Sequence, residues 1–304
     1  MFTLGCIPQV TIFVRATDGR QLAVRVRGNP GGHPVFSLHG TPGSREGPHP
    51  KGGQLYGMGV RLISYDRPGY GRSDRKVARL VADAADDVRT IADYLGIDRF
   101  GVLGRSGGGP HALACAALLP DRVTRACALV SLAPPDAEGL DWFAGMADSN
   151  IAEHKSAATD PDRLAADLVA TAAKIRVDPA SLVNTLGPEM PEADRRVVAD
   201  AGIRAKLVRN FAEALRDSAD GWIDDALAFV SPWDFDVSTI KVPVLLWHGE
   251  KDVFSPVSHT RWLAERIPGA IRTILPGKAH FGALEVVPDV LSWLIRPVPA
   301  DQSS

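Results

Sequence analysis

The stretch that most constrains the fold of this chain is GVLGRSGGGPHALACAALLP, which covers residues 101–120 and places four glycines around Ser106. An apolar run precedes the serine, and an alanine-rich run follows it. Residues 104–108 match the pattern G-x-S-x-G, which is typical of a sharp turn from a strand into a helix. Glycine is needed there because a Cβ would collide with the strand and the helix. The pattern therefore predicts that the Ser106 hydroxyl stands above a sheet edge, close to a helix N-terminus.

Apolar runs alternate with amphipathic stretches on both sides of this turn. Asp18-Gly19 separates two runs with strand character, which predicts a β-hairpin over residues 10–28. Further strands are predicted at residues 35–39, 60–66, 100–104, 123–133, 243–249 and 270–275, and helices at 81–95, 107–119, 257–266 and 284–295. Because these strands are apolar throughout, we expect an α/β fold with a mostly parallel sheet that helices cover on both faces.

Strand signals disappear between residues 134 and 236. Two Asp-Pro pairs in this block, at Asp160 and Asp178, predict helix starts, with the aspartate as cap and proline at the first helical position. The apolar spacing of Val197, Val208, Phe211 and Leu215 predicts one long amphipathic helix. We therefore expect an all-helical domain at 134–236, inserted into a core domain formed by 1–133 and 237–304.

Charge and cysteine usage restrict the class of protein. The net charge is −2 with both signs scattered, which argues against the basic patches that bind nucleic acid or a membrane surface. No apolar run approaches the roughly 20 residues that cross a bilayer. Cys115 and Cys127 lie in apolar runs and predict buried thiols, and the few residues before Cys6 do not resemble a lipoprotein signal. We expect a cytoplasmic protein, monomeric or homodimeric, that binds a small molecule and needs no metal or cofactor.

A serine hydroxyl becomes a nucleophile only with a base in hydrogen-bond reach and an acid that orients the base. His280 lies in PGKAHFG, between the last predicted strand and the last helix. Asp252 lies in HGEKDVFSP, directly after the strand at 243–249. Loops at the carboxyl ends of parallel strands meet at one edge of a sheet. We therefore predict that Ser106, Asp252 and His280 act as nucleophile, acid and base, although helix capping by Asp252 and a solvated His280 are the simpler alternatives.

Acyl transfer also needs two N–H donors for the oxyanion of the tetrahedral intermediate. One should be the amide of Gly107, directly after the nucleophile. The other should come from the loop after the strand at 35–39, where Pro42 has no N–H and the Thr41 amide is the candidate. We interpret His39 as a residue that shapes this loop rather than as a base.

The motifs HGTPGS, YDRPGYGRSD, GRSGGGP, HGEKD and GKAHFG together resemble the α/β-hydrolase superfamily, in its serine-nucleophile branch, from about residue 10 to 296. The resemblance implies an eight-stranded, mostly parallel sheet flanked by helices. It also implies that the helical block is a cap, inserted after the sixth strand and placed over the active site. In such proteins the YDRPGYGRSD loop is architectural, and we expect Asp66 and Arg67 to pair with each other.

The superfamily supports many reactions, so several functions stay open. Epoxide hydrolases and haloalkane dehalogenases carry an aspartate where this chain has Ser106, which disfavours both. Carboxylic ester hydrolysis is the leading prediction, with thioester hydrolysis, carbon–carbon bond hydrolysis and perhydrolysis as alternatives. HGTPG is also similar to proline iminopeptidases, which hold a free amine with cap carboxylates. The candidates here, Glu138, Asp141 and Asp148, are interpreted as a solvated helix face. A ligand receptor on the same fold is the non-enzymatic alternative.

Three residues are candidates for contact with the substrate. Arg105, beside the nucleophile, should either pair with an acid of the core, which we favour, or bind a substrate carboxylate. Trp142 and Phe143 follow the sixth strand and are the aromatic residues most expected to line a pocket. Other aromatic or sulfur side chains of the helical block, expected mainly in its core, are Met146, Trp222, Phe229 and Trp233. The pattern predicts a medium-sized, partly apolar substrate.

Overall fold

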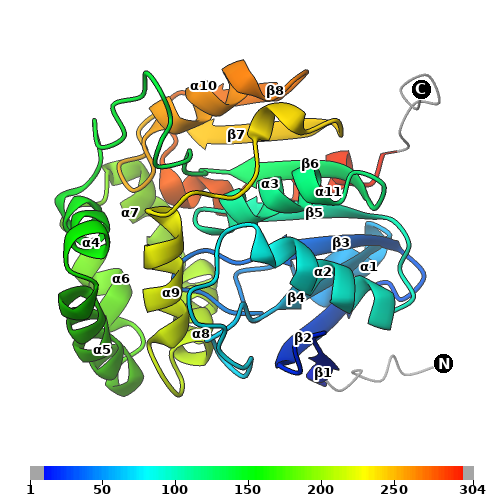
Figure 1. Ribbon diagram of the computed structural model, residues 1–304, viewed down its shortest axis with the longest axis horizontal. Helices are drawn as coiled ribbons and strands as arrows, with labels where there is room; N and C mark the ends of the chain where they lie inside the picture. The colour runs from blue at the N-terminus through cyan, green and yellow to red at the C-terminus, as the bar shows by residue number, and fades with distance from the viewer. Residues whose placement is uncertain (1–9, 297–304) are drawn as a thin grey trace.

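The computed structural model describes residues 10–296, which form an eight-stranded sheet with helices on both faces (Figure 1). The strand order is β1-β2-β4-β3-β5-β6-β7-β8. Strands β1 and β2 pair antiparallel, β2 pairs antiparallel with β4, and all other neighbours are parallel. The bounds are β1 Ile12–Arg15, β2 Gln21–Gly28, β3 His33–Leu38, β4 Val60–Tyr65, β5 Phe100–Arg105, β6 Val123–Leu129, β7 Val244–Gly249 and β8 Ile271–Leu275. The predicted mostly parallel sheet is confirmed.

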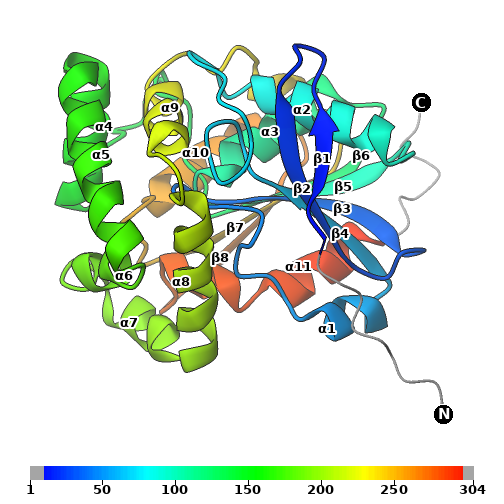
Figure 2. The ribbon, with the colours of Figure 1, turned by 90° about the horizontal axis from the view of Figure 1, so that it is seen from below.

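Both faces of the sheet are buried, which explains the uninterrupted apolar strands. On β3 and β5, Phe36 and Val102 pack in one cluster with the helices α2, α3 and α10, whereas Val35 and Leu103 pack in another with α1 and α11. Figure 2 shows α1 and α11 on one side of the sheet and α2 and α3 on the other. The bounds are α1 Gly52–Gly57, α2 Asp83–Tyr94, α3 Gly108–Leu118, α10 Val257–Arg266 and α11 Val287–Leu294. The short helix α1 was not predicted.

Six α-helices, a short 3-10 helix (Val237–Thr239) and no strand lie between β6 and β7, a stretch that the structure describes completely, and the six α-helices come first. They stand together on the left of Figures 1 and 2, beside the sheet. Their bounds are α4 Asp148–Thr159, α5 Pro161–Val177, α6 Ser181–Leu186, α7 Glu192–Ala199, α8 Ala201–Ala214 and α9 Asp220–Phe229. They share an apolar cluster of their own that includes Leu168, Leu207, Phe211 and Trp222. The helices α4–α9 are called the cap below.

The predicted helix boundaries in the cap are partly wrong. Asp160 does cap α5, and its carboxylate accepts a hydrogen bond from the Arg163 amide at 3.1 Å. Asp178, by contrast, ends α5, and the next helix begins at Ser181. The single long helix predicted from Val197 to Leu215 is two helices, because Asp200 leaves helical geometry and caps α8 through the Ile203 amide. A periodic apolar pattern does not indicate such a break, since the helices on both sides of it bury an apolar face of the same kind.

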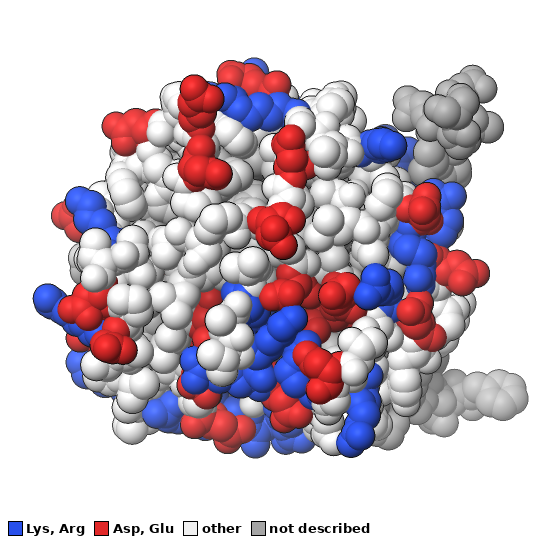
Figure 3. All heavy atoms as spheres, viewed as in Figure 1, with Lys and Arg blue, Asp and Glu red and all other residues white. Residues whose placement is uncertain are grey.

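The surface carries both signs of charge, and the described cysteines are buried. Acidic and basic side chains are interspersed on the face seen in Figure 3. Within residues 10–296, no helix is long and apolar enough to cross a membrane, and no cluster of His, Cys, Asp or Glu is arranged to hold a metal ion. Cys115 and Cys127 are buried free thiols, as predicted, and Cys6 lies outside the described residues.

Candidate active site

Ser106 occupies the turn between β5 and α3 and has a positive φ of 54°. This left-handed conformation is strained for serine. Hydrogen bonds hold it in place, because the Ser106 amide donates to the Leu129 carbonyl at 2.8 Å and the Gly109 amide donates to the Ser106 carbonyl at 2.8 Å. A Cβ on Gly108 would collide with the Leu38 carbonyl at the end of β3. The glycines therefore let β5, β3 and α3 approach closely enough to raise the serine above the sheet.

Asp252 and His280 meet although 28 residues separate them in the chain. Asp252 follows β7, and His280 follows β8 and begins a short 3-10 helix, η2 (His280–Leu284). His280 Nδ1 lies 2.8 Å from Asp252 Oδ2, while Asp252 Oδ1 accepts the amides of Phe254 and Ser255 at 2.8 and 3.0 Å. Burial alone would raise the pKa of Asp252, but His280 and His248 outweigh it and hold that pKa below its usual range. Asp252 is therefore an anion that orients the His280 ring.

The second imidazole nitrogen of His280, Nε2, makes no hydrogen bond with a described residue. Ser106 and His280 line the same cavity, of about 260 Å³. The cavity lies between the carboxyl ends of the strands and the cap, since residues of α4, α5 and α9 also line it. The structure thus brings the three predicted residues to one edge of the sheet, with Asp252 behind His280 and the other two at the cavity wall.

The two amides predicted to hold an oxyanion also lie at this wall. Thr41 and Gly107 both line the cavity, and neither backbone N–H donates a hydrogen bond to another described residue. They are close together, because a Cβ on Gly107 would collide with the Thr41 side chain and lie 2.9 Å from Phe229 Cζ. Two free N–H groups beside a serine are suited to stabilise a negatively charged oxygen.

A fully buried cap residue, Asp225 of α9, anchors the Thr41 loop. It accepts hydrogen bonds from the Thr41 hydroxyl at 2.5 Å and the Tyr70 hydroxyl at 2.8 Å, and it pairs with Arg67 at 2.5 Å and Arg79 at 2.6 Å. Burial opposes its ionisation, but the two guanidinium groups outweigh that effect and hold the pKa of Asp225 well below its usual range. The cap is thereby tied to the loop that carries one candidate oxyanion donor.

This network corrects the expectation that Asp66 and Arg67 pair with each other. Arg67 pairs with Asp225, and Asp66 pairs with Arg45. The side chains of these two successive residues therefore have different partners. His39 shapes the Thr41 loop, as predicted: its Nδ1 lies 2.8 Å from the Gly40 carbonyl oxygen, and its Nε2 accepts a hydrogen bond from the Arg67 amide at 3.1 Å.

Trp142 and Phe143, predicted to line the pocket, are not among the residues that line the cavity. The Trp142 indole donates to the carbonyls of Ala133 and Pro134, both at 3.1 Å, and its ring packs against His259. It therefore holds the segment that leaves β6. The aromatic side chains that do line the cavity are Phe211, Trp222, Phe229, Phe254 and Phe281.

The cap carboxylates named from the sequence, Glu138, Asp141 and Asp148, do not line the cavity either. Glu153 of α4 does, and it accepts a hydrogen bond from the Trp222 indole at 3.2 Å. Burial raises the pKa of Glu153 to about 7. No local sequence signal marks this glutamate, because α4 has a weakly amphipathic pattern and the contact is made with a distant helix.

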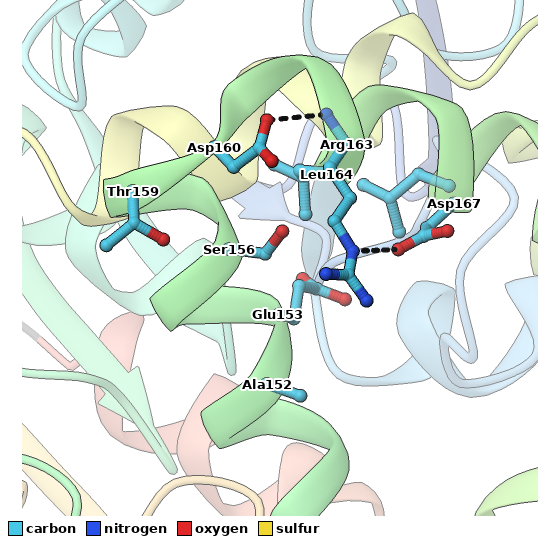
Figure 4. A pocket seen from close by; sticks show the side chains of 9 residues that line it. Ala152, Glu153, Ser156, Thr159, Asp160, Arg163, Leu164 and Asp167 are labelled. Atoms are coloured by element: carbon cyan, nitrogen blue, oxygen red, sulfur yellow. Dashed lines mark hydrogen bonds and ion pairs between the residues drawn. The ribbon is translucent and has the colours of Figure 1, made fainter.

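A larger hollow, of about 510 Å³, lies in the cap between α4 and α5 (Figure 4). It shares Glu153 and Leu168 with the Ser106 cavity, but neither Ser106 nor His280 lines it. Its charged residues contact one another, since Arg163 Nε lies 3.8 Å from Asp167 Oδ2. The candidate nucleophile and base therefore line the smaller cavity and not this hollow.

Arg105 does not form the ion pair with a core acid that we favoured from the sequence. Within residues 10–296 its guanidinium makes no hydrogen bond or ion pair, and Arg105 is one of the residues that line the Ser106 cavity. The reason is geometric: Asp252 and Asp194, the acids whose charges reach it, are held by other groups.

The chain is similar in sequence and in fold to known hydrolases. The family model described as alpha/beta hydrolase fold matches residues 33–285. The chain is 28% identical over 222 residues to the pimeloyl-acyl-carrier-protein methyl ester esterase of Nitrosomonas europaea, covering 72% of this chain and 78% of that one. It is 27% identical over 259 residues to the 2-hydroxymuconate semialdehyde hydrolase of Pseudomonas putida, covering 84% and 83%. The crystal structure of the enol-lactonase from Burkholderia xenovorans superposes with a TM-score of 0.68 at 20% identity, covering 93% of this chain and 97% of that one.

Proposed function

Since the chain belongs to the alpha/beta hydrolase fold family, we propose that it is a serine hydrolase that cleaves a carboxylic ester through an acyl-enzyme. The observation that carries the proposal is the position of Ser106, which is held with a φ of 54° at a cavity that His280 also lines. The Asp252–His280 hydrogen bond supplies the orientation that a base needs. Resemblance to a relative named as an ester hydrolase supports the same reaction class.

In the first half of the reaction, Ser106 Oγ attacks the ester carbonyl carbon and its proton passes to His280 Nε2. The carbonyl electron pair moves to oxygen, and the Thr41 and Gly107 amides stabilise the resulting oxyanion. The intermediate then collapses. The carbon–oxygen bond to the alcohol breaks, and the alcohol leaves with the proton from His280.

In the second half, a water molecule attacks the acyl carbon and gives a proton to His280. The bond from the acyl carbon to Ser106 Oγ breaks, the proton returns to the serine, and the carboxylic acid is released. Throughout, the ionised Asp252 keeps the His280 ring in place and stabilises its positive charge. The helices α4–α9 act as a cap domain that covers the cavity and sets the shape of the substrate site.

A second candidate is hydrolysis of an amide with a free amine, and Glu153 is the observation that favours it, as a cap carboxylate in the cavity wall. With a pKa of about 7, however, this carboxyl is only about half ionised at neutral pH, which makes it a weak anchor for an ammonium group. Activity toward aminoacyl 4-nitroanilides without activity toward acyl esters would favour this candidate over the ester hydrolase.

Fluorophosphonate labelling tests the proposal. The wild-type protein and the Ser156→Ala variant should be labelled, whereas Ser106→Ala should not, and only Ser106→Ala should lose turnover of 4-nitrophenyl butyrate. Ser156 is a suitable control because it lines the other hollow. Labelling that persists in Ser106→Ala, or an unlabelled wild-type protein, would contradict the mechanism.

A further inference from the structure

Arg105 is one of the residues that line the Ser106 cavity, and its guanidinium makes no hydrogen bond or ion pair with any residue between 10 and 296. It is the last residue of β5 and directly precedes the nucleophile. Its Nη2 atom and Ser106 Cβ lie 3.3 and 3.4 Å from the point where a Cβ on Gly40 would stand. The guanidinium and the serine side chain are therefore near neighbours.

Asp252 and Asp194, the two carboxylates whose charges act on Arg105, already accept hydrogen bonds from other groups. Both oxygens of Asp252 are taken, by His280 on one side and by the amides of Phe254 and Ser255 on the other. Asp194 accepts hydrogen bonds from two backbone amides of η2. Burial lowers the pKa of Arg105 to about 10, against the raising effect of these two carboxylates. The side chain is therefore still a cation at neutral pH, and it makes no direct ion pair with a carboxylate of the described residues.

A guanidinium has five N–H donors, and leaving them without acceptors in a partly desolvated place is unfavourable. Arg105 is the one Lys or Arg among the described residues that line this cavity. The rest of the wall exposes mainly leucine and phenylalanine side chains of the cap together with hydroxyl, amide and imidazole groups, and Glu153 is the one carboxyl among the described residues that line it. A ligand that complements the wall has an apolar body and a single negative charge beside the reacting carbonyl.

We propose that Arg105 binds a carboxylate of the substrate, so that the esters cleaved here carry an acid group a few bonds from the scissile carbonyl on an otherwise apolar chain. This inference rests on the proposed ester hydrolysis. A carboxylate fits better than a phosphate dianion because one guanidinium balances one charge and matches a carboxylate with two parallel hydrogen bonds.

A competing role for Arg105 is purely structural. A second hollow of about 30 Å³, enough for about one water molecule, is also lined by Arg105, together with Leu103, His49 and Asn210. If the guanidinium served only to hold water there, its loss would affect every substrate alike. Selectivity between charged and neutral esters is therefore the quantity to measure.

The test compares mono-4-nitrophenyl glutarate with 4-nitrophenyl pentanoate, which has a methyl group in place of the carboxylate. The wild-type protein should have the higher kcat/KM for the charged ester. In Arg105→Met the ratio of the two kcat/KM values should fall about 10- to 100-fold, the effect of a lost charge-assisted hydrogen bond. Arg105→Lys should keep part of the preference, and Arg163→Met, an exposed arginine of the cap, should keep all of it. A wild-type preference for the neutral ester, or an equal loss on both esters, would overturn the proposal.

Binding without turnover separates this inference from the proposed function. Monomethyl glutarate should bind Ser106→Ala, measured by calorimetry, and bind about 10- to 100-fold more weakly when Arg105→Met is added. If the wild-type protein cleaves neither ester, ester hydrolysis is wrong, but weaker binding by the double variant still supports the carboxylate site. Equal binding by the two proteins refutes that site. If Arg105→Met does not fold, as judged by circular dichroism, Arg105→Lys decides, and an unchanged ester preference together with unchanged monomethyl glutarate binding in that variant counts against the proposal.

Discussion

The backbone amide of His280 donates a hydrogen bond to the carboxylate of Asp194, from N to Oδ2 at 3.2 Å. The next amide, of Phe281, donates to Oδ1 of the same carboxylate at 2.7 Å. Asp194 belongs to α7, so a cap helix holds the first turn of the segment that carries the imidazole. The position of the candidate base is therefore set jointly by the core acid Asp252 and by a carboxylate of the cap.

Asp194→Asn should lower kcat by about 10- to 100-fold with a smaller change in KM, because misplacing the imidazole slows the chemical step more than it weakens binding. The asparagine has one acceptor oxygen where the aspartate has two, so one of the two amides loses its partner. Glu192→Gln is the matched control, since Glu192 lies exposed on the same helix. Steady-state kinetics on 4-nitrophenyl butyrate measure the effect. A kcat in Asp194→Asn equal to that of the control would refute the positioning role.

Asp252→Asn should reduce kcat by about 10⁴-fold, because the amide no longer stabilises the imidazolium and favours the wrong ring tautomer. The backbone amides of Phe254 and Ser255 remain in place and can donate only to an oxygen, which turns the amide nitrogen of the asparagine toward His280. Glu250→Gln, an exposed carboxylate two residues earlier, should keep full activity. A variant Asp252→Asn that retains a tenth of the wild-type rate would contradict the assigned role.

Asp225→Asn should destabilise the protein by about 3–5 kcal/mol, since it leaves the buried Arg67 and Arg79 without their counter-charge. Asp220→Asn, on the same helix, breaks an exposed pair with Arg75 and should cost less than about 1 kcal/mol. Urea unfolding monitored by circular dichroism measures both. Equal effects of the two substitutions would show that the buried network does not hold the cap and the Thr41 loop together.

Glu153 should make stability depend on pH. Its pKa is raised by burial from 4.5 to about 7, so between these values the folded protein binds more protons than the unfolded chain, and stability from this group falls as pH rises. Glu153→Gln removes the ionisation and should be more stable than wild type by roughly 3 kcal/mol at pH 8. Below pH 4.5 the two proteins should differ little, because Glu153 is protonated in both states.

Urea unfolding at pH 4, 6 and 8 checks this trend. The quantity to compare is the difference in free energy of unfolding between wild type and Glu153→Gln, because other buried carboxyls also titrate. Asp66 and Asp87, whose pKa values burial raises to about 6, contribute equally to both. A difference that stays constant with pH would mean that Glu153 is already ionised, or already neutral, over the whole range.

Features that depend on neighbouring residues could be predicted from the sequence. The turn at Ser106, the hairpin at Asp18-Gly19 and the cap at Asp160 each follow from backbone preferences of a few adjacent residues. The meeting of Asp252 with His280 could also be predicted, since parallel strands bring their carboxyl ends to one edge of the sheet.

Contacts made across the cap could not be predicted in this way. Trp142 was expected at the pocket, but its indole bonds to the segment after β6, and Glu153 and Asp194 reach the site from helices without any local signal. A helical pattern identifies which face is apolar but not which partner it meets. The break at Asp200 was not predicted either, because the helices on both sides of it bury the same kind of apolar face.

The sequence by itself therefore determined the order of the strands and of the core helices other than α1, the strained corner that carries Ser106, and the loops that bear its predicted partners. Only the tertiary structure decided which cap groups face the cavity, that Arg67 pairs with Asp225, and that Arg105 pairs with no acid between residues 10 and 296. The physical reason is the separation in sequence between the residues that fix each feature. Turn geometry and apolar periodicity are set within a few residues, whereas the partner of a buried charge depends on how segments distant in the chain pack together.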